Sequence, residues 1–137
     1  VIFIGGPQDN KSRYLVDSLN NIEKDYKIDI YYYNYKDNNP KYEIKGEKLV
    51  KTSDGTKLYS EMLEKLNDYI TTLNVEKEEQ VYKTEEKVFS TPAIVFILDK
   101  KIYGYYDDFE FDSSNNNIKL TDQYQKLLIE GFEKISK

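Results

Sequence analysis

The chain has 137 residues, a net charge of −5, and neither cysteine nor histidine. Without a thiol or an imidazole it excludes thiol–disulfide chemistry, metal centres held by cysteine or histidine, and Ser-His-Asp catalysis. The length predicts one domain over residues 1–137. The acidic charge argues against a nucleic-acid partner, and no apolar run approaches the roughly 18 residues that cross a bilayer.

The first part of the chain predicts a β-α-β unit. The apolar run Val1–Ile4 is typical of a buried strand that ends in a glycine-rich loop. A helix is expected from about Lys11 to Tyr26, with Asp9 or Asn10 as its cap. Residues 28–35 are aromatic and β-branched, which predicts a second strand parallel to the first. The core-facing stripe expected on the helix is Leu15, Leu19, Ile22 and Tyr26.

The middle of the chain is polar and predicts less structure. Residues 36–56 carry turn signals around a weak strand pattern, so we expect an insertion on the surface. An amphipathic helix should follow, with an apolar stripe that runs from Leu58 to Leu73. Residues 75–87 are rich in glutamate and lysine, which predicts a solvated connector.

The last part of the chain predicts a β-β-α unit. Thr91-Pro92 precedes residues 93–98, the most apolar run of the protein, and a two-residue turn joins this run to residues 101–106. An acidic loop is expected at about 107–117, and a final helix at about 120–135.

The predicted order of elements resembles the thioredoxin fold. That fold is an α/β fold in which a β-α-β unit and a β-β-α unit share a mixed four-stranded sheet with helices on both faces. Two segments carry the resemblance: Phe3-Ile4-Gly5-Gly6-Pro7, which leads into the first helix, and Thr91-Pro92-Ala93-Ile94-Val95, which enters the apolar strand. The chain is also similar to the bacteriocin-transport-accessory group of thioredoxin-like proteins from Gram-positive bacteria. The resemblance implies that Thr91-Pro92 is a cis bond that lies against the active-site loop.

The same resemblance implies that the chain is not a thiol–disulfide oxidoreductase. Where the family has Cys-x-x-Cys, this sequence has Asp9-Asn10-Lys11-Ser12. Disulfide exchange needs one thiol to attack and a second to resolve the mixed disulfide, and both positions lack sulfur. The helix N-terminus that stabilises a thiolate in the family would here stabilise Asp9 as a capping carboxylate.

The function implied by this resemblance is binding of a protein or an extended peptide by a redox-inactive accessory module without a cofactor or metal. An extended segment could form strand-like hydrogen bonds with Thr91 in the groove that the family uses for peptides. The residues expected to border this groove are Gln8, Asp9, Asn10, Ser12, Thr91 and Pro92.

Two alternatives remain open. The chain could be a structural or assembly module that makes contacts through the insertion at 36–56 and through Phe109 and Phe111. It could also be a hard-metal-dependent protein that uses the acidic residues of 107–117, although their spacing is not that of an EF-hand. We favour a solvated acidic loop over a cation site.

The remaining expectations concern the tyrosine run and the start of the chain. In the run Tyr31-Tyr32-Tyr33 with Tyr35, we expect most rings in the core with their hydroxyls at the rim. The chain begins at Val1, not methionine, and opens directly on a strand. We therefore expect that a leader or anchor has been removed, which would place the domain outside the cytoplasm. The oligomeric state is left open.

Overall fold

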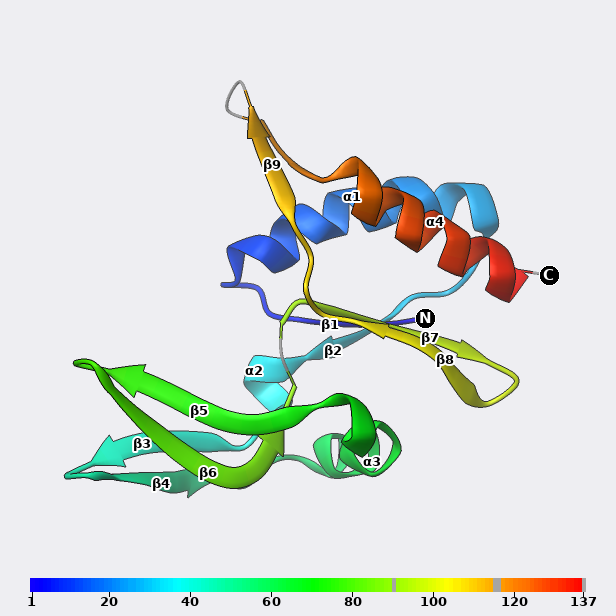
Figure 1. The fold of residues 1–137 in the computed structure, drawn as a ribbon. Helices are drawn as coiled ribbons and strands as arrows, with labels where there is room; N and C mark the ends of the chain where they lie inside the picture. The colour runs from blue at the N-terminus through cyan, green and yellow to red at the C-terminus, as the bar shows by residue number, and fades with distance from the viewer. Residues whose placement is uncertain (90, 115–116, 137) are drawn as a thin grey trace. The chain divides into compact units, whose positions relative to one another are not determined.

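The computed structural model describes residues 1–89, 91–114 and 117–136, and it divides the chain into two compact units. Unit 1 consists of Val1–Asn34 and Thr91–Lys137, and unit 2 of Tyr35–Ser90 (Figure 1). The insertion expected at 36–56 lies within unit 2. The second predicted helix and the predicted connector belong to unit 2 as well.

Unit 1 is built on a four-stranded mixed sheet. The strand order is β2-β1-β7-β8, in which β1 and β2 are parallel and the other neighbours are antiparallel. A mixed α/β architecture with a four-stranded mixed sheet is therefore confirmed. The strands are β1 (Ile2–Gly5), β2 (Tyr31–Asn34), β7 (Ala93–Leu98) and β8 (Lys101–Tyr106).

Two long helices cover one face of this sheet. Helix α1 (Asn10–Tyr26) joins β1 to β2, and helix α4 (Asp122–Ser136) ends the unit; both lie on the same side of the sheet in Figure 1. The helices expected near Lys11–Tyr26 and 120–135 are thus confirmed. The second predicted helix, with the stripe from Leu58 to Leu73, was expected to help cover both faces of the sheet, but it belongs to unit 2.

The core of unit 1 lies between the sheet and these helices. Helix α4 comes close to β7 because Gly131 has no side chain: a Cβ there would lie 2.5 Å from the ring of Phe96. The rings of Phe96 and Phe132 meet edge to face with their centroids 5.6 Å apart. The buried residues of this cluster are Val1, Phe3, Leu15, Leu19, Ile22, Ile94, Phe96, Phe109, Leu120, Leu128 and Phe132.

The acidic loop predicted at 107–117 is shorter than expected. Its second half contains strand β9 (Phe111–Ser114), which pairs antiparallel with β10 (Asn117–Leu120), while residues 115–116 lie outside the described part. Phe109 is buried in the core, with its ring against Tyr124 at a centroid distance of 5.8 Å. Phe111 packs against Tyr14. Local burial and a short strand pair therefore account for both phenylalanines.

Unit 2 consists mainly of two hairpins, which corrects two predictions. The helix expected to reach Leu73 ends at Leu66, and the connector expected at 75–87 lies in a β-hairpin. Its turn places Glu78 and Glu79 at positive φ, the geometry that two-residue hairpin turns require. The elements are α2 (Tyr35–Asn38), β3 (Lys41–Lys45), β4 (Lys48–Ser53), α3 (Lys57–Leu66), the 3-10 helix η1 (Asn67–Tyr69), β5 (Thr71–Lys77) and β6 (Gln80–Val88).

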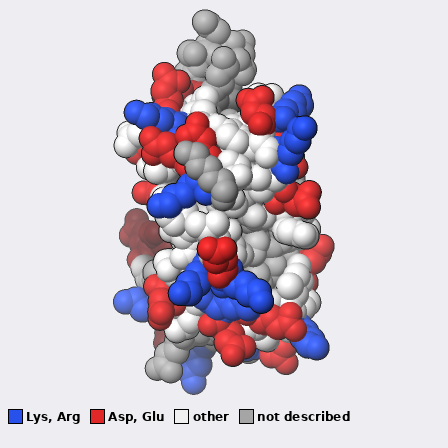
Figure 2. Space-filling model, turned by 90° about the vertical axis from the view of Figure 1, so that its right-hand side faces the viewer, with Lys and Arg blue, Asp and Glu red and all other residues white. Residues whose placement is uncertain are grey.

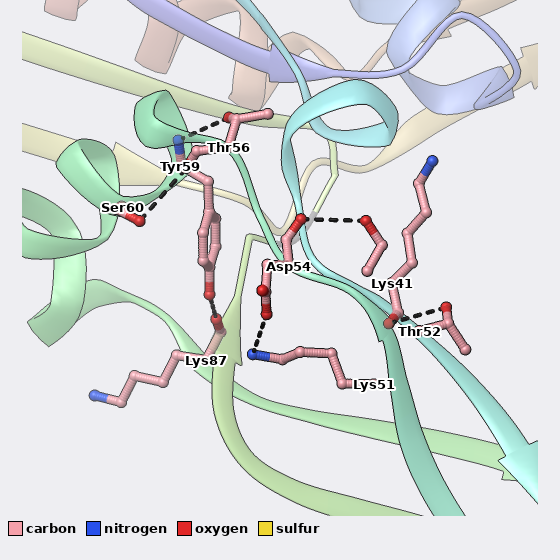
Figure 3. A network of polar contacts seen from close by, with 9 residues as sticks. Lys41, Lys51, Thr52, Asp54, Thr56, Tyr59, Ser60 and Lys87 are labelled. Atoms are coloured by element: carbon pink, nitrogen blue, oxygen red, sulfur yellow. Dashed lines mark hydrogen bonds and ion pairs between the residues drawn. The ribbon is translucent and has the colours of Figure 1, made fainter.

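Polar contacts connect the elements of unit 2 around the start of α3 (Figure 3). Thr56 caps the helix by accepting a hydrogen bond from the Tyr59 N–H at 3.2 Å, and its own hydroxyl donates to the Asn38 side-chain oxygen at 2.8 Å. The Tyr59 hydroxyl donates to the Lys87 carbonyl oxygen. These hydrogen bonds connect α2 and β6 to the first turn of α3.

Candidate functional site: the groove beside the first helix

The two residues that the resemblance aligns with the Cys-x-x-Cys positions are hydrogen-bonded to each other. The Ser12 hydroxyl donates to Asp9 Oδ2 at 2.6 Å and accepts from the Gly6 N–H at 3.3 Å. Asp9 occupies the N-cap position of α1, but its side chain accepts no capping hydrogen bond from the helix backbone. The prediction of a capping carboxylate is therefore wrong, because the buried Ser12 hydroxyl, only 3% exposed, takes the carboxylate as its acceptor.

The other predicted site residues surround this pair to different degrees. Thr91-Pro92 is a cis bond, as expected. Because Ala93 pairs with Ile4, the register places this bond at the end of the sheet where β1 runs into the loop before α1. Gln8 is exposed in that loop, and Asn10 is exposed as the first residue of α1. The structure thus joins Asp9 to Ser12 and brings the Thr91-Pro92 bond to the same sheet end.

A groove of about 320 Å³ opens beside these residues, along the flank of α1 that faces β2. One end is formed by Gly6, Pro7 and Ser12. Ser12 is the one predicted site residue that lines it; the groove extends away from Thr91-Pro92. Its volume lies within the lower range of ligand pockets.

The helix wall of the groove is a stripe of side chains on α1. Arg13, Val16, Asn20 and Glu23 line it at spacings of three, four and three residues, which keeps them on one helix flank. Residues one position apart on a helix differ by about 100° in direction, so this stripe runs beside the buried stripe of Leu15, Leu19 and Ile22. Helix α1 therefore presents one stripe to the core and another to the groove.

The sheet wall of the groove is apolar and partly aromatic. Phe3 on β1 pairs in register with Tyr32 on β2, and their ring centroids lie 5.5 Å apart. Ile30 extends this wall. Tyr32 is 52% exposed, so its ring offers apolar surface with a polar hydroxyl, a combination common at binding surfaces.

The exposure of Tyr32 corrects the prediction that most rings of the tyrosine run are core. Tyr33 is buried at 2% exposure, whereas Tyr31 is 68% exposed, and Tyr35 begins helix α2 instead of continuing the strand. The reason is the position of β2 at the edge of the sheet. An edge strand has a neighbour on one side only, and its rings can remain open to solvent.

The groove carries one charge of each sign, toward opposite ends of α1. Arg13 lies in the first turns and donates to Asn10 Oδ1, an uncharged acceptor, while Glu23 lies near the last turn. Among the side chains that the structure describes, neither takes part in an ion pair. Acidic and basic residues are interspersed on the face of the molecule drawn in Figure 2.

The acidic segment after β8 is a second place where charged groups gather. Burial raises the pKa of the Asp107 carboxyl, and the neighbouring Asp108 raises it further. Within residues 1–89, 91–114 and 117–136, no group of three or more acidic side chains is arranged to hold a metal ion. The helices of that same part are all too short or too polar to span a membrane.

Unit 2 has hollows of its own. A polar one of about 640 Å³ lies beside the β3–β4 and β5–β6 hairpins, where its lining includes Lys48 and Lys83. Another, of about 360 Å³, is lined by residues that include Tyr35 and Phe89. The groove of unit 1 differs from both because it adjoins the predicted Asp9–Ser12 site.

Sequence reasoning missed the groove residues Arg13, Val16, Asn20, Glu23 and Tyr32. One signal was present: Val16 is an apolar residue outside the core stripe of its helix, in a stripe that is otherwise polar. The edge position of β2 depends on the pairing of distant strands, which spacing does not reveal. No protein-family model, curated protein or solved structure matches the chain.

Proposed function

We propose that the chain is a redox-inactive, thioredoxin-like module that binds an extended segment of a protein partner. The observation that carries the proposal is the groove that begins at Gly6, Pro7 and Ser12 and continues between α1 and β2. Its apolar sheet wall can accept a side chain of the segment, while polar groups on α1 face the segment's backbone and charges.

The thioredoxin-like part of the proposal is supported by the topology of unit 1. A parallel β1-α1-β2 unit and an antiparallel β7-β8 pair followed by α4 share one sheet in the order β2-β1-β7-β8. Asp9 and Ser12 stand at the start of α1, at the positions where that family has its cysteines. Neither side chain supplies sulfur, so the role that we propose for this end of the sheet is binding and not disulfide exchange.

A selection from a displayed library of random peptides tests the proposal on the full chain. We expect enriched peptides that bind the wild-type chain and lose binding to V16R, because a long charged side chain would fill the groove. D17R is the matched control: it adds the same arginine to an exposed position of α1 that does not line the groove.

Three results would contradict or relocate the proposed site. The absence of enriched peptides would contradict the binding function. Peptides that bind V16R as tightly as the wild type would show that this groove is not the site. Peptides that V16R retains and T91R loses would place the partner against the Thr91-Pro92 end of the sheet.

A further inference from the structure

The groove has a fixed arrangement of charge and apolar surface along α1. Arg13 lines one part of it and Glu23 another, ten residues further along the same helix. At a rise of 1.5 Å per residue, their Cα atoms are about 15 Å apart along the helix axis. Val16 and Asn20 lie between them on the helix, and Tyr32 lines the same groove from β2.

An extended peptide matches this length. A strand rises about 3.3 Å per residue, so about four or five residues span the distance from Arg13 to Glu23. The apolar surface between the charges is formed by Val16 and Tyr32, which remain 36% and 52% exposed. One apolar side chain in the middle of the peptide would cover both.

The charges of the groove are available to such a peptide. Arg13 donates to an amide oxygen, and Glu23 has no basic partner among the side chains that the structure describes. A carboxylate placed near Arg13 can form a charge-assisted hydrogen bond, and an ammonium or guanidinium group near Glu23 can do the same. A segment with two like charges would meet repulsion at one end.

We propose that the partner segment is an extended peptide with an acidic and a basic residue about four positions apart and an apolar residue between them. This inference rests on the proposed peptide-binding function and adds the chemistry that selects the segment. Complementary charge is the term that sets specificity, while the apolar contact supplies affinity.

Four short peptides of one design test this rule by amide chemical-shift titration of the full chain. The peptides are acetylated and amidated forms of Glu-Ser-Leu-Thr-Lys, Glu-Ser-Leu-Thr-Glu, Lys-Ser-Leu-Thr-Lys and Gln-Ser-Leu-Thr-Gln. We expect the first to bind at least about threefold more tightly than the other three, because each exposed ion pair contributes a modest amount. The shifts should centre on Val16, Asn20 and Tyr32.

Two charge variants of the groove, R13E and E23R, should change which of the four peptides binds most tightly. With R13E both charged positions of the groove are acidic, so the peptide with two lysines should become the tightest ligand. With E23R both are basic, and the peptide with two glutamates should become the tightest. K24E and D17R add the same new charges to α1 without lining the groove, and they should leave the wild-type preference unchanged.

The outcomes separate this inference from the function on which it rests. Equal binding of all four peptides, with shifts in the groove, would overturn the charge rule and leave peptide binding intact. Unchanged preferences in R13E and E23R would overturn it as well. If none of the four peptides shifts the groove residues at millimolar concentration while a library-selected peptide does, the charge rule fails alone. If the library-selected peptide does not shift them either, the binding function fails as well.

Discussion

Units 1 and 2 differ in how their strands are paired. In unit 1 the first strand pairs with a strand from the far end of the chain, as Ile2 does with Val95. In unit 2 each strand pairs with its neighbour along the chain, β3 with β4 and β5 with β6. Long-range pairing closes a long loop at an entropic cost, which burial of apolar surface must offset. Local hairpins close short loops, so the burial of much less apolar surface offsets their entropic cost.

This difference explains which parts of the fold the sequence predicts. The sheet of unit 1 is visible as apolar runs such as Ala93–Leu98, and its helices as stripes that include Leu15 and Leu128. The hairpin β5–β6 is built largely from polar and charged residues, and Val81 within it is 55% exposed. A pattern search that relies on buried apolar residues assigns such a segment to a connector.

The first prediction compares the core of unit 1 with its surface. F96A should lower the free energy of unfolding by about 3–5 kcal/mol, because a fully buried ring is replaced by a cavity. I129A, on the partly exposed side of α4, should lower it by less than about 1 kcal/mol. Urea denaturation followed by circular dichroism measures both. Equal losses would show that unit 1 is not organised around Phe96.

The second prediction tests the close approach of α4 to the sheet. G131A should lower the free energy of unfolding by about 1–3 kcal/mol through overpacking against Phe96. In an open helix the same change would stabilise by about 1 kcal/mol, because alanine has the higher helix propensity. Thermal and urea denaturation show directly whether G131A lowers or raises the free energy of unfolding. A more stable variant would contradict the contact between Gly131 and Phe96.

The third prediction applies the comparison to unit 2. Y59F removes the hydroxyl that donates to the Lys87 carbonyl and keeps the ring that packs against Phe89. We expect a loss of about 0.5–1.5 kcal/mol, which is the usual net contribution of one hydrogen bond. Y82F, which removes an exposed hydroxyl that donates only to Gln80 two residues away in the same unit, is the control. If Y59F costs as much as F96A, the hydrogen bonds of unit 2 matter more than we infer.

The fourth prediction is the smallest and depends on pH. The pKa of Asp107 is raised in the folded state, so its ionised form is favoured less there than in the unfolded chain. Above that raised pKa the charge destabilises the fold, and D107N should therefore be slightly more stable than the wild type near pH 7. The advantage should disappear as the pH falls below about 4, where the carboxyl is protonated in both states. Denaturation curves across this pH range test the sign, and a constant difference would contradict it.

The candidate site was predicted only in part. Glycine, proline and helix periodicity mark the start of α1 in the sequence, whereas the cis Thr91-Pro92 bond was expected from the resemblance to the thioredoxin fold. The hydrogen bond from Ser12 to Asp9 was not predicted, because it depends on the close approach of Ser12 to Gly5 and Gly6 in the folded chain. The groove beyond it requires β2 to be an edge strand, which is a property of the assembled sheet. An extracytoplasmic location stays a prediction.

The most direct test of the account is to map where a selected peptide binds on the full chain. Amide chemical shifts, followed during titration with a peptide from the random library, report on both units in one experiment. We predict saturable shifts at Val16, Asn20 and Tyr32 in unit 1, and their loss in V16R. Shifts confined to residues 35–90 would contradict the account and transfer the binding function to unit 2.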